Sequence, residues 1–414
     1  MFQIFTGIVA LAAILSFINK KFLKLPETIG VMVLAILTIF LLAGILLIDK
    51  SSFLNICQIV EQINFRELLF DFLLSFLLFA GSIHVNLHSL LKEKETVITY
   101  ASFGVILSTF IIGSGFYFIA NAIGLEVNYL YSLIFGALIS PTDPVAVLAL
   151  LKKANAPEKM EIKIVGESLF NDGVGIVVFL SLLSIATMST DGVEFTHIAQ
   201  EFIREAGGGL LMGVILGFIG SKLIKAMSHE PIIAVHISLA IVMGGYSLSA
   251  MLHISGALAM VVAGLIIGNG LHKNTLSEAT KNHINVFWKV LDEIFNAVLF
   301  VLIGIEILAL DFQMDYLIIG AASIIIVLLS RYISIFSSNF FLKKEQRPKG
   351  NELFILTWAG LRGGISIALA LTLPESETRS LLLFATYVVV VFSIIAQGLS
   401  IEKIITKLLK NKHG

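Results

Sequence analysis

The chain has 414 residues, of which 57% are hydrophobic and only 14% are charged, and its mean hydropathy is +0.95. These values exclude an ordinary soluble globular protein and predict an all-α polytopic membrane protein. The formal net charge of -1 gives no sign of a nucleic-acid partner, and the single cysteine, Cys57, excludes an internal disulfide and a cysteine-built metal site.

Stretches that could cross a bilayer core, each of about 20 mostly apolar residues, occur about thirteen times along the chain. The first carries its basic residues after the apolar run, the reverse of a signal peptide, so we expect it to be a retained span. A surface helix within 51–64 would be an additional element. The expected spans are residues 3–18, 26–48, 65–84, 97–122, 129–151, 162–187, 206–226, 231–250, 255–269, 285–308, 316–340, 352–373 and 381–404.

The loops between these spans predict an orientation. If the N-terminus is outside, the alternate loops that fall inside hold most of the 28 lysines and arginines. The outer loops then hold only Lys50, Arg66, Arg204 and Arg379. We therefore expect a multi-pass protein of a cell membrane, with its C-terminus in the cytoplasm, and the short tail favours a prokaryotic inner membrane. No GxxxxGK[ST] motif occurs, so any transport must draw on an ion gradient.

The fifth expected span is interrupted by two prolines. Pro141 and Pro144 flank Asp143 within "SPTDP" near its centre. Each proline removes a backbone donor and clashes with the preceding turn, so the helix should unwind there. Unwound backbone at membrane depth is tolerated only beside protein or a water-filled cavity, and such breaks mark ion sites in transporters.

The twelfth expected span, in "WAGLRGGISIALAL", carries three glycines around Arg362 at a similar depth. Its offset of seven spans from the fifth is odd, so the two run in opposite directions. We interpret this as an inverted repeat with two crossing interrupted helices, spans 5 and 12. Two independent kinks in long helices are the alternative.

Four polar side chains lie on one stripe of the sixth expected span. Glu167 and Asn171 are four residues apart, as are Ser168 and Asp172, so all four face one point. A charge inside a membrane helix is expensive, so a buried acid is a functional hypothesis by default. We assign Asp172 to ion binding with Asn171, Ser168 and Thr142, because a small alkali cation that sheds water needs hard oxygen ligands.

Glu167 needs a cationic partner inside the membrane. The candidates are Arg331, in "LLSRYISIF", and Arg362. A structural ion pair that fixes the bundle is the favoured role for this carboxylate.

Other charged residues support or surround the site. Asp143 and Arg362 lie at the two helix breaks, where they would compensate the dipoles of the half-helices. Asp292 and Glu293 could line a cytoplasmic funnel or pair with Lys289, and the sequence does not separate these alternatives.

The remaining titratable groups give no clear signal. Asp71 is ambiguous, and His236 and His253 could sense pH, although a histidine satisfied by a neighbouring helix is favoured. No cluster has zinc-ligand spacing, so we expect no cofactor and no catalytic residue.

Taken together, "SPTDPVAVLALLKK", "GESLFNDGVGIVVF", the arginine of "SRYISIF" and "WAGLRGGISIALAL" resemble motifs of the monovalent cation:proton antiporters, in the branch of NhaP-type proteins and sodium/hydrogen exchangers. The resemblance covers nearly the whole chain. It implies a homodimer in the lipid bilayer, with mobile core helices near 97–187 and 316–404 and dimerisation helices near 1–84 and 206–308, all in one transporter domain of residues 1–414.

The resemblance also implies roles for individual residues. Asp172 would bind the transported Na⁺ or a proton, with support from Thr142, Ser168 and Asn171, and the partner of Glu167 would be Arg331. Because the tail after the last expected span is short, we expect no cytoplasmic regulatory domain like that of the exchangers.

From these residues we expect Na⁺/H⁺ antiport for pH homeostasis, with one proton exchanged for one cation at a single carboxylate and without net charge movement. Li⁺ or K⁺ as the cation stays open, and a potassium/proton antiporter or a proton-coupled solute symporter is the alternative. A passive channel and an intramembrane aspartyl protease built on Asp143 and Asp172 fit less well, and the protein is not expected to be an enzyme.

Overall fold

A computed structural model describes residues 2–46, 73–143, 147–148, 150–151, 154, 156–187, 195–271, 276–307 and 312–410. All regular secondary structure in these ranges is helical, as predicted. Seven of the helices are long and apolar enough to cross a membrane. The number of thirteen crossings stays a prediction, and the suggested surface helix within 51–64 and Asp71 lie outside the described residues.

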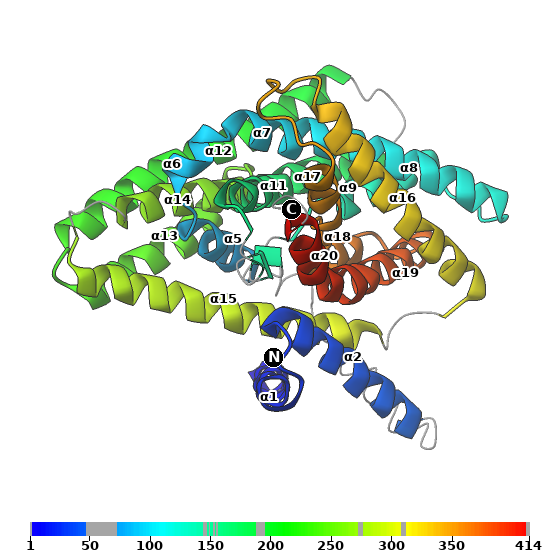
Figure 1. Ribbon diagram of the computed structural model, residues 1–414, viewed down its shortest axis with the longest axis horizontal. Helices are drawn as coiled ribbons and strands as arrows, with labels where there is room; N and C mark the ends of the chain where they lie inside the picture. The colour runs from blue at the N-terminus through cyan, green and yellow to red at the C-terminus, as the bar shows by residue number, and fades with distance from the viewer. Residues whose placement is uncertain are drawn as a thin grey trace.

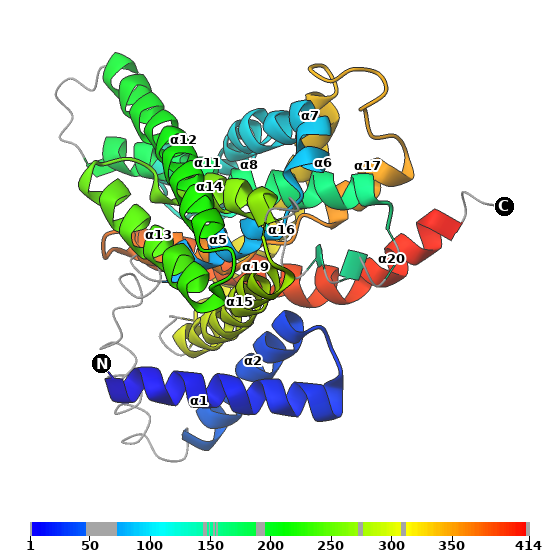
Figure 2. The same ribbon diagram turned by 90° about the vertical axis from the view of Figure 1, so that its left-hand side faces the viewer.

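The first two expected spans form a hairpin. Its parts are α1 (Phe2–Ile18), the π-helical turn η1 (Asn19–Leu23) and α2 (Glu27–Leu46). The Asn19 side chain closes the turn, because its amide nitrogen donates to the Leu25 carbonyl at 3.0 Å and its oxygen accepts from the Leu25 N–H at 3.2 Å. Both α1 and α2 pack against α15 (Glu278–Glu306), and Figures 1 and 2 show the hairpin on the outer side of that helix.

A second group of helices surrounds the interrupted spans. It comprises α7 (Lys94–Thr99), η3 (Tyr100–Gly104), α8 (Val105–Ala122), α9 (Tyr129–Ile139), α11 (Glu158–Thr187), α16 (Met314–Ser338), α17 (Asn351–Trp358), α18 (Gly364–Leu371), α19 (Glu377–Phe392), η5 (Ser393–Gln397) and α20 (Gly398–Lys410). Within it α8 packs against α9 and α16, and α19 packs against α16 and α18.

A third group packs around α14 (Gly256–Leu271). Here α5 (Leu74–Ile83) and α12 (Phe195–Ala226) lie against α14, α13 (Pro231–Met251) lies against α12, and α6 (Leu87–Lys92) follows α5. Outside the third group, α15 contacts α18. The second and third groups meet mainly where α11 contacts α12, α14, α6 and α5. The helix that carries the predicted ion-binding stripe therefore lies at their junction.

Two helices begin earlier than the hydropathy pattern predicts. The seventh expected span starts at 206, whereas α12 starts at Phe195, and the tenth starts at 285, whereas α15 starts at Glu278. In α12 the added turns carry Glu201, Arg204 and Glu205. Glutamate and arginine are good helix formers but are unfavourable in a membrane span. A span predicted from hydrophobicity therefore begins later than the helix itself.

Candidate functional site

The two interrupted helices meet at their breaks. The helical backbone of α9 ends at Ile139 and residues 140–143 are non-helical, while α17 ends at Trp358 and residues 359–363 are non-helical before α18. The Asp143 N–H donates to the Leu361 carbonyl at 2.7 Å. This bond joins segments that are far apart in the sequence and confirms the predicted crossing of two interrupted helices.

Arg362 lies in the break of the second interrupted helix, and its side chain bonds the end of the first. Its Nη1 donates to the Ser140 carbonyl and, at 2.9 Å, to the Pro141 carbonyl, both at the C-terminal end of α9. The side chain is buried. A cation beside these unpaired carbonyls favours the negative end of the α9 dipole and replaces the bonds that the break removes.

Asp143 lies at the opposite break. A methyl group added at Gly363 would come within 2.7 Å of Asp143 Oδ2, so the carboxylate lies directly against this glycine. Gly363 immediately precedes α18, and an acid at a helix N-terminus is favourable. The crossing thus carries one charge of each sign, at the helix ends where each is stabilising.

Thr142 connects the first break to the stripe of α11. The Asn171 side chain bonds it twice: Nδ2 donates to Thr142 Oγ1 at 2.8 Å, and Oδ1 accepts from the Thr142 N–H at 3.3 Å. The Thr142 and Ser168 hydroxyls lie 2.9 Å apart and share a hydrogen bond. All three residues are buried. The predicted supporting residues therefore form one network that fixes the unwound segment against α11.

Asp172 lines a small cavity of about 50 Å³ between the breaks, α5 and α15. Its side chain is 5% exposed. The other polar side chains of the cavity wall are Thr142, Asp143, Asn296 and Ser366. Among the described residues no group forms an ion pair with the Asp172 carboxyl or donates a hydrogen bond to it. An ionised carboxylate that is buried without a partner is costly, because its charge is neither hydrated nor neutralised.

Glu167 contacts Arg331 and not Arg362. Nη1 of Arg331 donates to Oε1 of Glu167, and Nη2 donates to Oε2 at 2.8 Å and to the Leu356 carbonyl at 3.5 Å. Both side chains are buried. The pair is bidentate, which is the strongest geometry for an arginine and a carboxylate, and it ties α11 to α16.

The structure separates Asp292 from Glu293. Asp292 Oδ1 accepts a hydrogen bond from Asn296 Nδ2 at 3.0 Å, and Asn296 lines the cavity of Asp172. Glu293 points elsewhere, with its carboxylate 3.9 Å from the Lys289 ammonium and 49% of its side chain exposed. Of these two acids, Asp292 is the one connected to the site.

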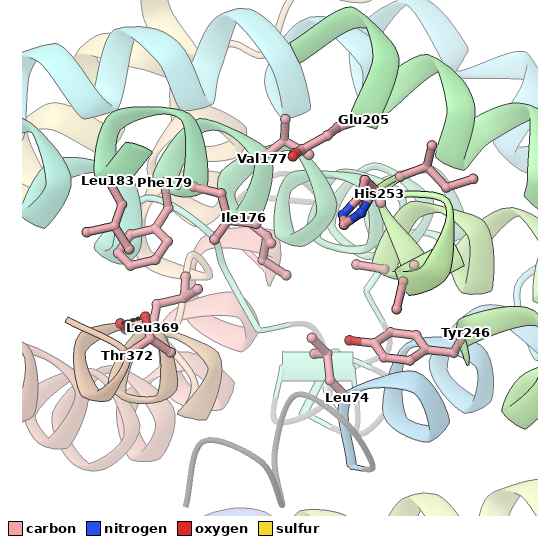
Figure 3. Close-up of a pocket in the computed structure, with 16 residues that line it drawn as sticks. Leu74, Ile176, Val177, Phe179, Leu183, Glu205, Tyr246, His253, Leu369 and Thr372 are labelled. Carbon is pink, nitrogen blue, oxygen red and sulfur yellow. Dashed lines mark hydrogen bonds between the residues drawn. The ribbon is translucent and has the colours of Figure 1, made fainter. Parts of the chain in front are cut away.

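A larger cavity of about 670 Å³ begins one turn further along α11 (Figure 3). Ile176, four residues after Asp172, belongs to its wall. Figure 3 shows Phe179 and Leu183 of α11 with Leu369 and Thr372 on one side, and Glu205, Tyr246 and His253 on the other. The backbone of His253 is left-handed, with φ of 53°.

Two glycines of α11, Gly173 and Gly175, lie between Asp172 and Ile176 in the sequence and allow close packing. A methyl at Gly173 would come within 2.7 Å of Leu258 Cγ, and one at Gly175 within 3.1 Å of Pro141 Cδ.

Neither Glu205 nor Tyr246 was singled out from the sequence, because a cavity formed between separate helices leaves no local pattern. Within the searched residues no group of three or more His, Cys, Asp or Glu could hold a resident metal ion.

The chain matches the family described as "Sodium/hydrogen exchanger, transmembrane" over residues 7–407. It is 39% identical to the Na(+)/H(+) antiporter NhaP of Pseudomonas aeruginosa over 414 residues, which cover 99% of this chain and 97% of that protein. It is 33% identical to the Na(+)/H(+) antiporter NhaH of Halobacillus dabanensis over 394 residues, which cover 94% and 93%.

Its fold is similar to the structure of the sodium proton antiporter MjNhaP1 from Methanocaldococcus jannaschii at pH 8, with a TM-score of 0.77 and 20% identity over 99% of this chain and 98% of that one. The crossing of two interrupted helices, the polar stripe beside it and the match along almost the full length agree, and the chain belongs to the sodium/hydrogen exchanger family.

Proposed function

We propose that the protein is a secondary active sodium/proton antiporter in which the Asp172 carboxylate binds Na⁺ and H⁺ alternately. The observation that carries this proposal is the burial of Asp172 in a small cavity, without an ion-pair partner among the described residues. The relatives named above as Na(+)/H(+) antiporters support it. Since an empty ionised carboxylate is costly in an occluded site, the group crosses only when it is loaded, and exchange is obligatory.

The size of the cavity favours a small cation over an organic solute. Pockets that enclose organic ligands are typically about 300–1,000 Å³, and one buried water already needs about 10–15 Å³. The cavity of about 50 Å³ suits a cation with a few waters. This argues against a proton-coupled solute symporter. Hard oxygens bind Na⁺, Li⁺ and K⁺ alike, so a potassium/proton antiporter is the second candidate.

The neighbours of Asp172 support one-for-one exchange. Asn171 cannot titrate, Glu167 is held by Arg331, and the Asp143 carboxylate lies at the N-terminus of α18. In this scheme only Asp172 changes its load, one proton replaces one sodium ion, and no net charge moves. Thr142, Ser168 and Asn171 hold the unwound backbone in place, and Asp143 and Arg362 compensate the half-helix dipoles.

The larger cavity supports access of ions to the site from the side of the membrane opposite the cytoplasm. It lies at the end of α11 away from Lys159 and Lys163, which the loop charges predict to be cytoplasmic. We expect the mobile core to comprise the helices near 97–187 and 316–404, and the helices near 1–84 and 206–308 to form a homodimer interface. The expected location is a prokaryotic inner membrane, N-terminus outside and C-terminus inside, where exchange would serve pH homeostasis.

The direct test is exchange by the purified protein in liposomes, with wild type beside Asp172→Asn. A sodium gradient should drive proton movement in the wild type, and the variant should show none while it remains folded and inserted. Repeating the assay with K⁺ and Li⁺ determines the cation. With the membrane potential clamped at several values, a rate or final gradient that follows the potential would contradict the electroneutral stoichiometry. Exchange by Asp172→Asn would overturn the proposal as a whole.

A further inference from the structure

A third cavity lies between α12 and α14, away from Asp172. Over most of their length these helices pack closely because glycines of α12 face α14. A methyl at Gly213 would come within 2.6 Å of the Ala259 carbonyl oxygen, and one at Gly217 within 2.8 Å of Ile266 Cβ. Small residues let helix backbones approach in a membrane. After Gly220 the sequence of α12 changes to larger residues, and a cavity of about 470 Å³ opens between the two helices.

Most of the wall of this cavity is apolar. Ile224, Ile267 and Leu271 form its buried part, with exposures of 1%, 1% and 3%. Phe218 also lines the cavity and is 65% exposed. The cavity therefore opens on to the exposed surface of α12.

One end of the cavity is cationic. Lys222 and Lys225 line it and are exposed, and their spacing of three residues places them on one face of α12. The other polar side chains of the described wall are Ser221 and Asn269, and no acid is among them. In the part of the chain that the structure describes, neither ammonium group has an ion-pair or hydrogen-bond partner.

We propose that this cavity binds one anionic phospholipid, with the phosphate between Lys222 and Lys225 and an acyl chain along Phe218. Two lysines without an acid in the described wall complement a phosphate, and the apolar wall complements a hydrocarbon chain. The lysines lie in the last two turns of α12, where side chains of this type reach the level of lipid headgroups. A free phosphate would contact only the two lysines, and an acyl chain alone would contact only the apolar wall. A phospholipid contacts both, so it is favoured over free phosphate.

The proposal is independent of the transport mechanism and is tested by binding. The full-length protein is delipidated in detergent and titrated with phosphatidylglycerol, phosphatidylcholine of the same acyl chains, or glycerol 3-phosphate, and bound lipid is counted by native mass spectrometry. The variant is Lys222→Gln/Lys225→Gln. The matched control is Lys92→Gln/Lys94→Gln, which removes two exposed lysines that do not line the cavity.

We expect the wild type to bind one phosphatidylglycerol with saturation and to prefer it to phosphatidylcholine. Loss of both lysines should weaken binding roughly 30-fold, since each contributes about a factor of five near a lipid surface. The control should bind like the wild type, and glycerol 3-phosphate should not compete. Equal binding of both lipids, equal weakening in the control, unchanged binding in the variant, or competition by glycerol 3-phosphate would each overturn the proposal.

Discussion

Arg331 and Glu167 meet with both terminal nitrogens of the guanidinium on both oxygens of the carboxylate, and this pair joins α16 to α11 directly beside Ser168. Both side chains are buried. Its position next to the network of Thr142, Ser168 and Asn171 makes it a structural support of the proposed site.

Glu167→Gln should destabilise the protein by about 3–5 kcal/mol, because it leaves the Arg331 charge buried and unpaired. The double variant Glu167→Gln/Arg331→Met should regain most of that loss, since no charge remains. Thermal unfolding in detergent measures both. A double variant that is less stable than Glu167→Gln would contradict this account of the pair.

The apparent affinity for Na⁺ should fall as the pH falls, because a proton and a cation compete for the Asp172 carboxylate. Below the pKa of that group each pH unit should weaken sodium binding by up to tenfold, and above it the affinity should be constant. Sodium binding is measured between about pH 9 and pH 6, a range over which the proton concentration changes about a thousandfold. Glu293→Gln, at an acid that points away from the site, serves as the control that keeps this dependence. An affinity that does not change over the range would rule out competition.

Thr142→Val should weaken apparent sodium affinity about 5- to 30-fold, because it leaves the buried Asn171 amide and Ser168 hydroxyl without their partner, at a cost of about 1–2 kcal/mol. Thr142→Ser keeps the hydroxyl and should remain near the wild type. Half-saturation by Na⁺ in proteoliposomes compares the two. Equal half-saturation concentrations in Thr142→Val and Thr142→Ser would contradict this explanation.

Gly173→Ala should abolish or strongly reduce exchange, since its methyl would come within 2.7 Å of Leu258 Cγ, at the contact of α11 with α14 beside Asp172. Adding Leu258→Ala should restore much of the activity by removing the obstructing side chain. Gly244→Ala is the matched control, because no atom lies within 4 Å of the added methyl. A pair of substitutions no more active than Gly173→Ala alone would refute the steric explanation.

Arg362→Gln should lower stability by about 2–4 kcal/mol, because the carbonyls of Ser140 and Pro141 lose their buried donor. Arg379→Gln removes an arginine whose partner, Glu375, is 94% exposed, and should cost less than about 1 kcal/mol. Chemical unfolding of both variants tests the difference. Equal losses would show that Arg362 is not a helix cap.

The sequence predicted the helical fold and the two breaks because prolines, glycines and hydrophobic length act locally. The stripe from Glu167 to Asp172 was predictable for the same reason, since helical spacing alone places these residues on one face. The choice of Arg331 over Arg362 as the partner of Glu167 came only from family resemblance. It depends on how α16 packs against α11, which no local rule determines.

Other parts of the site also depend on tertiary packing. Asp143 was predicted at a helix end, and the structure places it in the wall of the Asp172 cavity with Ser366 and Asn296 as well. Asp292 and Glu293 were treated together, although adjacent helical residues point about 100° apart, and only Asp292 reaches Asn296.

The backbone bond from Asp143 to Leu361 and the bonds from Arg362 to the end of α9 fasten the two breaks into one rigid piece. In the proposed cycle an ion at Asp172 keeps the core oxygens of Thr142, Ser168 and Asn171 as neighbours whether it entered from one face of the bilayer or the other. Equal coordination means equal intrinsic affinity, so the carrier has no built-in forward direction. Inverting both gradients should invert the flux and leave the half-saturation concentrations unchanged.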